Sequence, residues 1–402
     1  MKIVYLNASG QMGGAERSLL DFMASLRAAD PQVALELIAG AGGAFLDQAR
    51  ALGVEAHPLL YPRALARLGD AGGRAHLPGT LGRASISAPS VALYTLRLRR
   101  ALAAAAPDLI HTNGFKMHLL GAWAAPRGVP VLWHVHDYIS SRPLMARLMR
   151  AQAGRCTAVV ANSLSVADDV RAACGARLRV FPIHNAVDLR RFSPAGPALD
   201  LDRLAGLAPP SRPVVRIGLV ATMARWKGHE VFLRALKMLS GDPPVRGYVV
   251  GGALYETEGS QCDLEELRCL AGSLGLAGRV GFTGFVDDAA AAMRALDVVV
   301  HASTQPEPFG LVVAEAMACG RAVVVSRGGG TAEIVTPGED ALVHEAGCVP
   351  ALAGRMGELA RDPALRAALG AKAAQSARRR FARERLAEQL MPIYRLLCAE
   401  AA

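Results

Sequence analysis

Residues 1–26, MKIVYLNASGQMGGAERSLLDFMASL, contain one complete strand–loop–helix unit. The short apolar run at 3–6 predicts a buried strand, and the glycines between 10 and 14 predict a loop. The apolar positions that follow recur at the spacing of one helix face: Leu19, Leu20, Met23 and Leu26. Because such units join neighbouring parallel strands, this opening predicts an α/β fold.

Short apolar runs and amphipathic stretches keep alternating along the rest of the chain, in two series. Further strands are predicted at residues 33–38, 109–111, 131–135 and 158–161, and then at 214–220, 248–250, 280–283, 298–300 and 322–325. Between the two series, residues 193–213 contain five prolines. That composition is typical of a domain linker.

The sequence therefore predicts an α/β protein with two Rossmann-like domains, whose parallel sheets face each other across a crevice. The expected boundaries are 1–195 for the first domain, 196–213 for the linker, 214–380 for the second domain and 381–402 for a terminal helix. Ligands of such sheets bind at the carboxyl ends of the strands, so the loops there are the candidate sites.

The composition excludes several classes of protein. Of the 402 residues, 52% are hydrophobic and 20% are charged, which supports buried cores and disfavours a disordered or fibrous chain. No apolar run reaches the 18 residues of a membrane-spanning helix. The chain turns polar at Asn7, too early for a secretory signal, and its seven cysteines form no Cys-x-x-Cys pair. We therefore expect a cytoplasmic protein without a disulfide or zinc framework.

The net charge of +10 favours anionic partners. Nucleic acid is the least expected of these, because only 5% of the residues are aromatic and no basic stretch is interleaved with stacking rings. Residues 61–100 carry seven arginines and one acidic residue. Phosphorylated ligands and anionic lipids are therefore the expected classes.

A second basic stretch, residues 140–156, has leucines and methionines between its arginines and contains no acidic residue. This pattern predicts a basic amphipathic helix that lies on an anionic membrane surface. A solvated face of an arginine-rich protein gives the same pattern, so both interpretations stay open. The candidate membrane contacts are Arg142, Arg147 and Arg150.

In each predicted domain, the turn that follows the first strand is a candidate site. In one, Gly13 and Gly14 precede Glu16 at the start of a helix, where a phosphate can approach the backbone. A plain tight turn gives the same sequence. In the other, Arg225 and Lys227 lie just before a helix, and two cations beside a helix N-terminus predict a diphosphate site. A solvated basic turn gives the same sequence.

Residues 307–315, EPFGLVVAE, are the most informative segment. The prolines at 306 and 308 disfavour helix, which places Glu307 on a loop. The helix is expected to begin near Gly310 or Leu311, so that Glu315 lies about one turn inside it. Carboxylates accept hydrogen bonds from sugar hydroxyls, and the N–H groups of Phe309, Gly310 and Leu311 suit a phosphate. The segment therefore predicts a site for one polar ligand.

Two histidines, His134 and His136, end the predicted strand at 131–135 and point the same way along it. A metal pair is disfavoured because no third ligand is apparent nearby. We expect His136 to face the crevice, His134 to be a hydrogen-bonded structural residue, and the protein to contain no metal site.

Together these motifs resemble the retaining glycosyltransferases of family 4, which share the two-domain GT-B fold. The resemblance covers most of the chain, from GGAE at 13–16 through NAVD at 185–188 to GGTAE at 329–333. Its most specific element is the pair of glutamates, Glu307 and Glu315, separated by seven residues in a Pro-Phe-Gly context.

The resemblance implies that the second domain binds a UDP- or GDP-linked sugar. Glu315 would bind the ribose hydroxyls, and Lys227 would neutralise the diphosphate leaving group. Glu307 and the amides of Phe309, Gly310 and Leu311 would hold the transferred sugar and the phosphate.

The first domain would bind the acceptor. Gly14 would approach the diphosphate, His136 would contact the sugar near the reacting carbon, and the helix after Phe381 would cross back to the first domain. One departure matters: the family usually has an arginine five residues before the lysine, where this chain has Thr222. Arg225 is the candidate replacement.

We therefore expect a metal-independent, retaining hexosyltransferase that needs no cofactor besides its nucleotide sugar. It would act on a hydroxyl of a glycan or lipid-linked acceptor in polysaccharide or lipopolysaccharide biosynthesis, in the cytoplasm or at the inner face of the cell membrane. Two alternatives stay open: a nucleotide-sugar epimerase of the same fold, and a non-catalytic protein that binds nucleotide sugars or a lipid surface. The missing G-x-G-x-x-G fingerprint disfavours a nicotinamide dehydrogenase.

Overall fold

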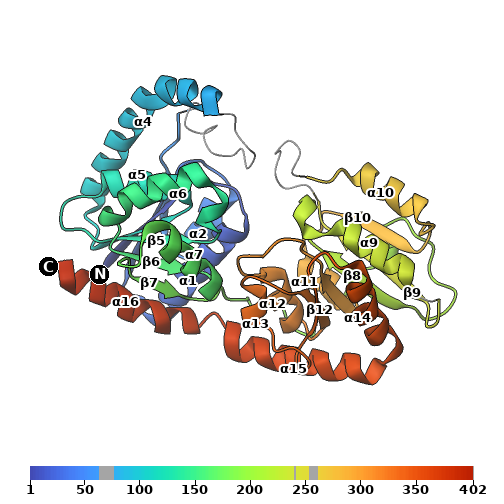
Figure 1. Ribbon diagram of the computed structural model, residues 1–402. Helices are drawn as coiled ribbons and strands as arrows, with labels where there is room; N and C mark the ends of the chain where they lie inside the picture. Colours follow the sequence, from blue (N-terminus) through green and yellow to red (C-terminus); the bar gives the residue numbers. More distant parts are fainter. Residues whose placement is uncertain (63–76, 240, 253–260, 402) are drawn as a thin grey trace. The chain divides into compact units, whose positions relative to one another are not determined.

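The computed structural model describes residues 1–62, 77–239, 241–252 and 261–401, with side chains in the first helix after the first gap described from residue 89 onward. The chain divides into two compact units (Figure 1). Unit 1 comprises Met1–Ala186 and Arg383–Ala402, and unit 2 comprises Val187–Ala382. The first boundary therefore lies at Val187, not at the expected residue 195.

Unit 1 contains a seven-stranded parallel sheet with the order β3-β2-β1-β4-β5-β6-β7. Its strands are β1 (Lys2–Asn7), β2 (Ala34–Ala39), β3 (Glu55–Pro58), β4 (Leu109–Asn113), β5 (Val131–Val135), β6 (Ala158–Ala161) and β7 (Val180–Pro182). Its helices are α1 (Gly14–Ala29), α2 (Ala44–Ala51), α4 (Leu77–Ala105), α5 (Phe115–Ala124), α6 (Pro143–Gln152), α7 (Leu164–Cys174) and α16 (Arg385–Ala401), with the short helices η1 (Ile139–Ser141) and η2 (Ala153–Arg155) around α6.

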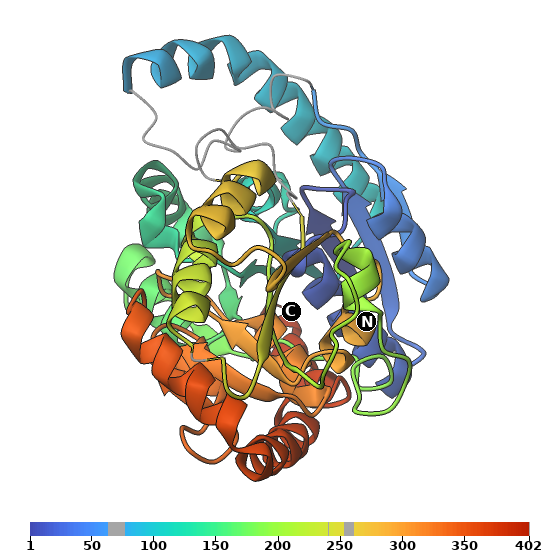
Figure 2. The same ribbon diagram turned by 90° about the vertical axis from the view of Figure 1, so that its right-hand side faces the viewer.

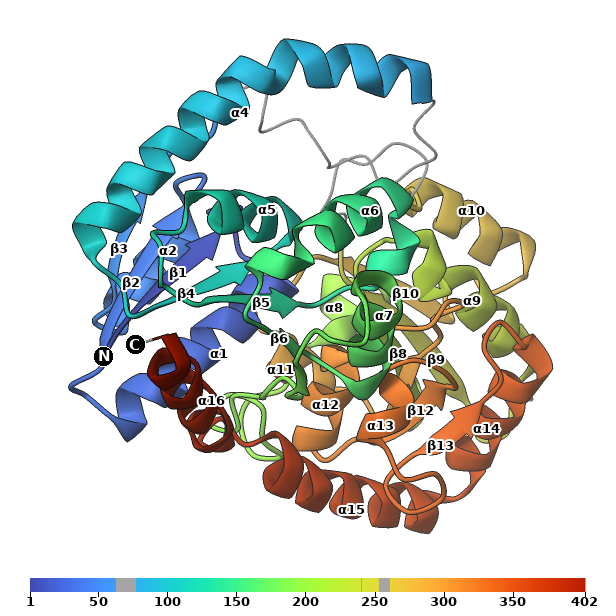
Figure 3. The same ribbon diagram turned by 60° about the vertical axis from the view of Figure 1, so that its left-hand side comes forward.

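The alternation of side chains along β1 explains why helices cover both faces of this sheet. Ile3 and Tyr5 pack into one core with α1, α2 and α16, whereas Val4 and Leu6 pack into the other with α4, α5 and α7. Figure 3 shows α16 beside α1, although the two helices lie at opposite ends of the chain. Because both faces are buried, the strands are nearly continuous apolar runs.

Unit 2 contains a six-stranded parallel sheet with the order β10-β9-β8-β11-β12-β13. Figure 2 shows the helices of this unit, coloured from yellow-green to red, around its strands. Its strands are β8 (Val215–Val220), β9 (Val245–Val250), β10 (Val280–Gly284), β11 (Val298–His301), β12 (Ala322–Ser326) and β13 (Leu342–His344). Its helices are α8 (Leu201–Leu204), α9 (His229–Met238), α10 (Leu264–Ser273), α11 (Ala289–Arg294), α12 (Leu311–Ala318), α13 (Thr331–Ile334), α14 (Val349–Arg361) and α15 (Pro363–Phe381), with η3 (Arg225–Lys227) before α9. These two sheets confirm the predicted α/β class.

The expected linker, residues 196–213, is part of unit 2. It contains α8, whose buried Asp202 accepts hydrogen bonds from Arg216 at 3.0 Å, from Arg246 at 2.5 Å and from the Tyr248 hydroxyl at 2.6 Å. The prolines keep this segment irregular, but one carboxylate anchors it to β8 and β9. Proline content therefore indicated irregular backbone here and not a separation between domains.

The expected terminal helix at 381–402 is interrupted. Phe381 ends α15 in unit 2, and Arg385 begins α16 in unit 1. Between them Ala382 pairs with Val187, whose N–H donates to the Phe381 carbonyl at 2.8 Å. The two segments that connect the units are therefore hydrogen-bonded to each other where they leave unit 2.

Candidate functional site

In unit 2, the loops after β8 and β11 bring Lys227 and Glu307 together. Lys227 Nζ donates to Glu307 Oε1 at 2.6 Å, and both side chains are largely buried, 16% and 11% exposed. The same ammonium lies 4.1 Å from the centre of the Trp226 ring. The Thr304 N–H donates to the Trp226 carbonyl at 2.7 Å, which ties the two loops together. The structure thus fixes a buried cation at the carboxyl ends of two neighbouring strands.

The second oxygen of Glu307 faces His301, the last residue of β11. His301 Nε2 lies 2.7 Å from Oε2, and the Ser303 hydroxyl donates to the same oxygen at 2.9 Å. On the other side of the ring, Ser326 Oγ lies 2.9 Å from His301 Nδ1. Burial alone would raise the pKa of Glu307, but the charges of Lys227 and His301 and their hydrogen bonds lower it well below its usual range. Glu307 is therefore a carboxylate at neutral pH.

At two glycines of this site, a neighbouring backbone segment lies so close that a side chain would not fit. Gly228 has φ of +77°, and a side chain there would run into the Ala302 carbonyl. The Gly330 N–H donates to the Glu307 carbonyl at 2.8 Å, and a side chain on Gly330 would collide with Pro308. The glycine-rich loop after β12 therefore shapes the fold around Glu307.

Helix α12 begins at Leu311, directly after the loop that carries Glu307. Phe309 is buried with its ring edge-on to Phe381, so its side chain belongs to the core. Glu315 lies one turn inside the helix and is 7% exposed. The first turn of a helix leaves N–H groups without intrahelical acceptors, so the start of α12 at Gly310 and Leu311 is a position suited to an anion.

Arg225 does not join the Lys227–Glu307 pair. Its guanidinium donates two hydrogen bonds to Glu266 of α10, at 2.9 and 2.8 Å, and both side chains are about half exposed. The expectation that Arg225 replaces the arginine missing at Thr222 therefore finds no support in this geometry. A carboxylate 41 residues further along the chain holds it at the surface.

In unit 1, Gly14 is the first residue of α1 and is exposed. A side chain at Gly14 would meet nothing within 4 Å, so packing does not require a glycine there. Glu16 caps the helix, because its Oε2 accepts from the Gly13 N–H at 3.1 Å. Burial raises the pKa of Glu16, and hydrogen bonds from Asn7 and the backbone offset part of that rise.

A chain of side-chain hydrogen bonds leads from Glu16 to His136. Asn7 donates to Glu16 Oε1 at 3.2 Å, and Asn113 donates to Asn7 Oδ1 at 2.6 Å. His136 Nε2 lies 2.7 Å from Asn113 Oδ1, so this ring nitrogen carries the hydrogen. Burial lowers the pKa of His136 to about 3. The ring is therefore neutral at neutral pH and is oriented from the carboxyl ends of β1 and β4.

His134 differs from the expected hydrogen-bonded histidine. The side chain is fully buried, and neither ring nitrogen has a hydrogen-bond partner among the described residues. Its ring stacks on Phe22 at 4.5 Å between centres and lies 3.9 Å from the His136 ring. The strand pattern placed it in the core correctly, but the core supplies aromatic contacts and no acceptor.

The basic stretch at 140–156 forms α6, flanked by η1 and η2, and not one continuous helix. Only Met149 of α6 is buried, while Leu144 and Leu148 are 63% and 40% exposed. Arg147 and Arg150 are exposed beside them, and the Arg142 guanidinium lies 5.2 Å from the Phe115 ring. Residues 63–76 of the other basic stretch lie outside the described residues. Over the part of the chain that is described, no helix is long and apolar enough to cross a membrane.

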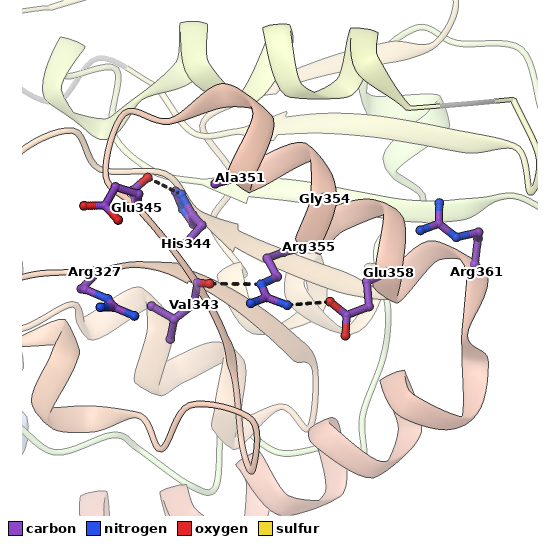
Figure 4. Close-up of a pocket in the computed structure, with 9 residues that line it drawn as sticks. All are labelled: Arg327, Val343, His344, Glu345, Ala351, Gly354, Arg355, Glu358 and Arg361. Atoms are coloured by element: carbon purple, nitrogen blue, oxygen red, sulfur yellow. Dashed lines mark hydrogen bonds and ion pairs between the residues drawn. The ribbon is translucent and has the colours of Figure 1, made fainter.

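A separate cavity of about 640 Å³ lies between β13 and α14 and contains none of the predicted donor-binding residues. Arg355 crosses it from α14, donating to the Val343 carbonyl and to Glu358 (Figure 4). The other residues that line it are Arg327, His344, Glu345, Ala351, Gly354 and Arg361. Among the described residues, no group of three or more His, Cys, Asp or Glu side chains has the arrangement of a metal site.

Three further residues of the two sites, His301, Ser303 and Asn113, belong to none of the motifs recognised in the sequence. All three are buried polar residues at or just after the carboxyl end of a parallel strand. That position could have identified them in the sequence, because a polar side chain at the end of an apolar run is expected to face a ligand or another site residue.

Two family models match the chain. Residues 12–191 match Glycosyltransferase Family 4, and residues 214–376 match Glycosyl transferases group 1. A D-inositol 3-phosphate glycosyltransferase of Xylanimonas cellulosilytica is 34% identical over 308 residues, which is 71% of each chain. A lipopolysaccharide core biosynthesis mannosyltransferase, LpcC of Rhizobium leguminosarum, is 33% identical over 54% of this chain, and the match spans only 60% of that protein.

Among solved structures, HepE of Anabaena in complex with UDP-glucose superimposes with a TM-score of 0.78. It is 28% identical, and the match covers 98% of this chain and all of that one. The same protein has been solved with UDP. The two parallel sheets described above, each covered by helices, are thus shared along nearly the whole chain. The protein is a family 4, group 1 glycosyltransferase with the GT-B architecture.

Proposed function

We propose that the protein transfers a hexosyl group from a UDP- or GDP-linked sugar to a hydroxyl of a glycan or lipid-linked acceptor, with retention of configuration and without a metal ion. The buried Lys227–Glu307 pair carries this proposal, since it fixes a cation and an anion at the carboxyl edge of the unit 2 sheet. The complexes of HepE with UDP and UDP-glucose support a nucleotide-sugar donor.

The proposed roles follow from charge and position. Breaking the anomeric C–O bond leaves negative charge on the diphosphate, which the Lys227 ammonium and the amides of Phe309, Gly310 and Leu311 are suited to stabilise. Glu315, buried one turn into α12, accepts hydrogen bonds from the ribose hydroxyls. A fixed cation and amide dipoles supply this stabilisation without a bound metal.

Glu307 is assigned to the hydroxyls of the transferred sugar. Its Oε1 accepts from Lys227 and its Oε2 from His301 and Ser303, which makes the carboxylate a poor nucleophile. These donors stabilise the negative charge and leave Oε1 able to accept a further hydrogen bond from a sugar hydroxyl, which favours retention by same-face attack over a covalent glycosyl–enzyme intermediate. By the family resemblance we assign His136 of unit 1 to the reacting sugar and Gly14 to the diphosphate. The lack of any packing reason for a glycine at position 14 agrees with that role.

The two alternative functions fit this site less well. An epimerase needs a group that exchanges protons near neutral pH. Glu307 has a strongly lowered pKa, and the pKa of His136 is about 3, so neither group exchanges protons there. A protein that only binds nucleotide sugars has no need for two buried opposite charges at the leaving group. Slow hydrolysis of the donor, measured as free sugar released without an acceptor, would distinguish a transferase from a protein that only binds nucleotide sugars.

We expect calorimetric titration with UDP and GDP to give micromolar binding of at least one of them, in the presence of a metal chelator. Glu315→Ala should weaken that binding by about 10- to 100-fold, because a hydrogen bond to a charged group contributes about 1.5–3 kcal/mol. Glu339→Ala, a change at an exposed residue of unit 2, serves as the control. Undiminished affinity in Glu315→Ala would remove its ribose role, and binding that disappears with the chelator would remove metal independence.

We further propose that α6 places the protein on an anionic membrane surface, where a lipid-linked acceptor is available. Leu144 and Leu148 are one helical turn apart and exposed, and Arg142, Arg147 and Arg150 carry positive charge beside them. Exposed leucines next to arginines suit the boundary between headgroups and acyl chains. The relationship to a lipopolysaccharide core mannosyltransferase supports such an acceptor.

Replacing Arg142, Arg147 and Arg150 by glutamine should lower the affinity for phosphatidylglycerol vesicles by about 100-fold, at roughly 1 kcal/mol for each arginine. The loss should shrink as salt is added. The charge-matched control replaces Arg203, Arg212 and Arg379, which are exposed in unit 2, and should bind vesicles like the unmodified protein. Equal binding by the two triple variants would show that α6 is only a solvated face.

A further inference from the structure

The two oxygens of Glu307 have different partners. Oε1 accepts from Lys227, which comes from the loop after β8. Oε2 accepts from His301 and Ser303, which come from the end of β11. Lys227 is therefore carried by a loop, whereas His301 and Ser303 are carried by a buried strand end.

His301 is held firmly in this arrangement. The residue is 8% exposed, and its ring has Ser326 on the Nδ1 side and Glu307 on the Nε2 side. Ser303 Oγ lies 3.0 Å from Nε2 and also donates to Glu307. The His301 carbonyl lies 3.2 Å from His344 Nε2. Because Glu307 is a carboxylate and can only accept, His301 Nε2 carries the hydrogen.

Lys227 has two competing partners in the proposed reaction. In the structure it is paired with Glu307, and in the donor complex it is assigned to the diphosphate. Moving it to the diphosphate removes one cation from a buried carboxylate, and leaving a buried charge without compensation is unfavourable. Something else must hold the Glu307 charge if Lys227 is to leave.

We propose that His301 is a positioning residue that holds the charge of Glu307 and thereby releases Lys227 to the diphosphate of the donor. This inference rests on the proposed function. His301 acts through Glu307 and Lys227 and does not itself contact the donor. Ser303 contributes to the same oxygen, and Ser326 fixes the ring from behind. The carboxylate keeps its orientation toward the sugar while the lysine changes partners.

The experiment is a double-mutant cycle read by calorimetric titration with UDP and GDP. His301→Ala should weaken nucleotide binding by about 10- to 100-fold, because Glu307 then retains Lys227 more strongly. Glu307→Gln removes the competing charge and should bind the nucleotide at least as tightly as the unmodified protein. In the Glu307→Gln background, adding His301→Ala should change the affinity by less than about twofold, since the two effects are coupled.

A purely structural role for His301 predicts the same loss in both backgrounds, and that result would overturn the proposal. So would unchanged affinity in His301→Ala. If neither UDP nor GDP binds the unmodified protein, the proposed function fails and the inference fails with it. If the unmodified protein binds but the variants do not follow the predicted pattern, only the inference fails. Two further variants cover a misfolded His301→Ala: His301→Gln keeps an N–H donor and should restore binding, and Ser326→Ala should give a smaller loss that disappears with Glu307→Gln.

Discussion

Lys227→Met is expected to lower kcat by about 100- to 1,000-fold, the loss that follows removal of one donor to a developing oxyanion. The ammonium is nearly buried at the carboxyl edge of the unit 2 sheet, where little water is available to replace it. Methionine keeps most of the length and apolar bulk of the side chain but has no ammonium group, so it loses the charge and the contact of Nζ with the Trp226 ring. Initial rates of sugar transfer at saturating donor, together with donor hydrolysis without acceptor, measure the effect.

Arg225→Ala is the matched control for this prediction. It removes a cation two residues away whose partner, Glu266, lies at the surface. Because exposed ion pairs contribute at most about 1 kcal/mol, kcat should fall by less than about fivefold. A large loss in Arg225→Ala with a small one in Lys227→Met would reverse the two assignments. Thermal unfolding of both variants establishes that each is folded.

Unit 1 is expected to unfold on mild acidification. Burial lowers the pKa values of His118 and His136 to about 3, and it lowers those of His111 and His134 well below the usual 6.5. Well below pH 6.5 and above the lowered values, the unfolded chain binds four more protons than the folded one, so stability falls as the pH falls. Four protons correspond to about 5 kcal/mol per pH unit. For a stability of about 5–15 kcal/mol, unfolding follows at roughly pH 5.5 to 3.5.

Urea unfolding followed by tryptophan fluorescence at several pH values measures this slope, since Trp133 is fully buried in unit 1. His134→Phe should reduce the slope by about 1.4 kcal/mol per pH unit, and it should raise the stability at pH 7 by removing two buried nitrogens without partners. The control is His57→Gln, because His57 is 43% exposed. A slope that is the same in all three proteins would exclude buried histidines as the cause.

The sequence predicted the alternating strands and helices well, because long apolar runs are buried on both faces of each sheet. It missed three strands at sheet ends or margins: β3, β7 and β13. These have three or four residues each, too few to form a recognisable apolar run, and β3, EAHP, is also largely polar. Such short strands form because they are hydrogen-bonded to a neighbouring strand, and the local sequence does not show that neighbour.

The sequence identified individual residues of the candidate site but not which of them contact one another. Lys227 and Glu307 were each identified from their local motifs, but they are 80 residues apart, and nothing local shows that they pair. The ion pair of Arg225 could not be predicted for the same reason, since Glu266 belongs to a different helix. For His134 the burial was predictable and the hydrogen bonding was not, because periodicity identifies a buried position without showing whether a hydrogen-bond partner is present.

The return of α16 to unit 1 has a consequence for biosynthesis. Unit 2 is one continuous segment, whereas unit 1 is completed only by Leu386, Leu390, Tyr394 and Leu397 of α16, which lie in its core. On the ribosome, these residues emerge after all of unit 2 has been made. Unit 2 can therefore fold during translation, while the unit begun first waits for the last helix with part of its apolar surface uncovered. The nascent chain is thus most exposed to chaperones and proteases through its N-terminal half.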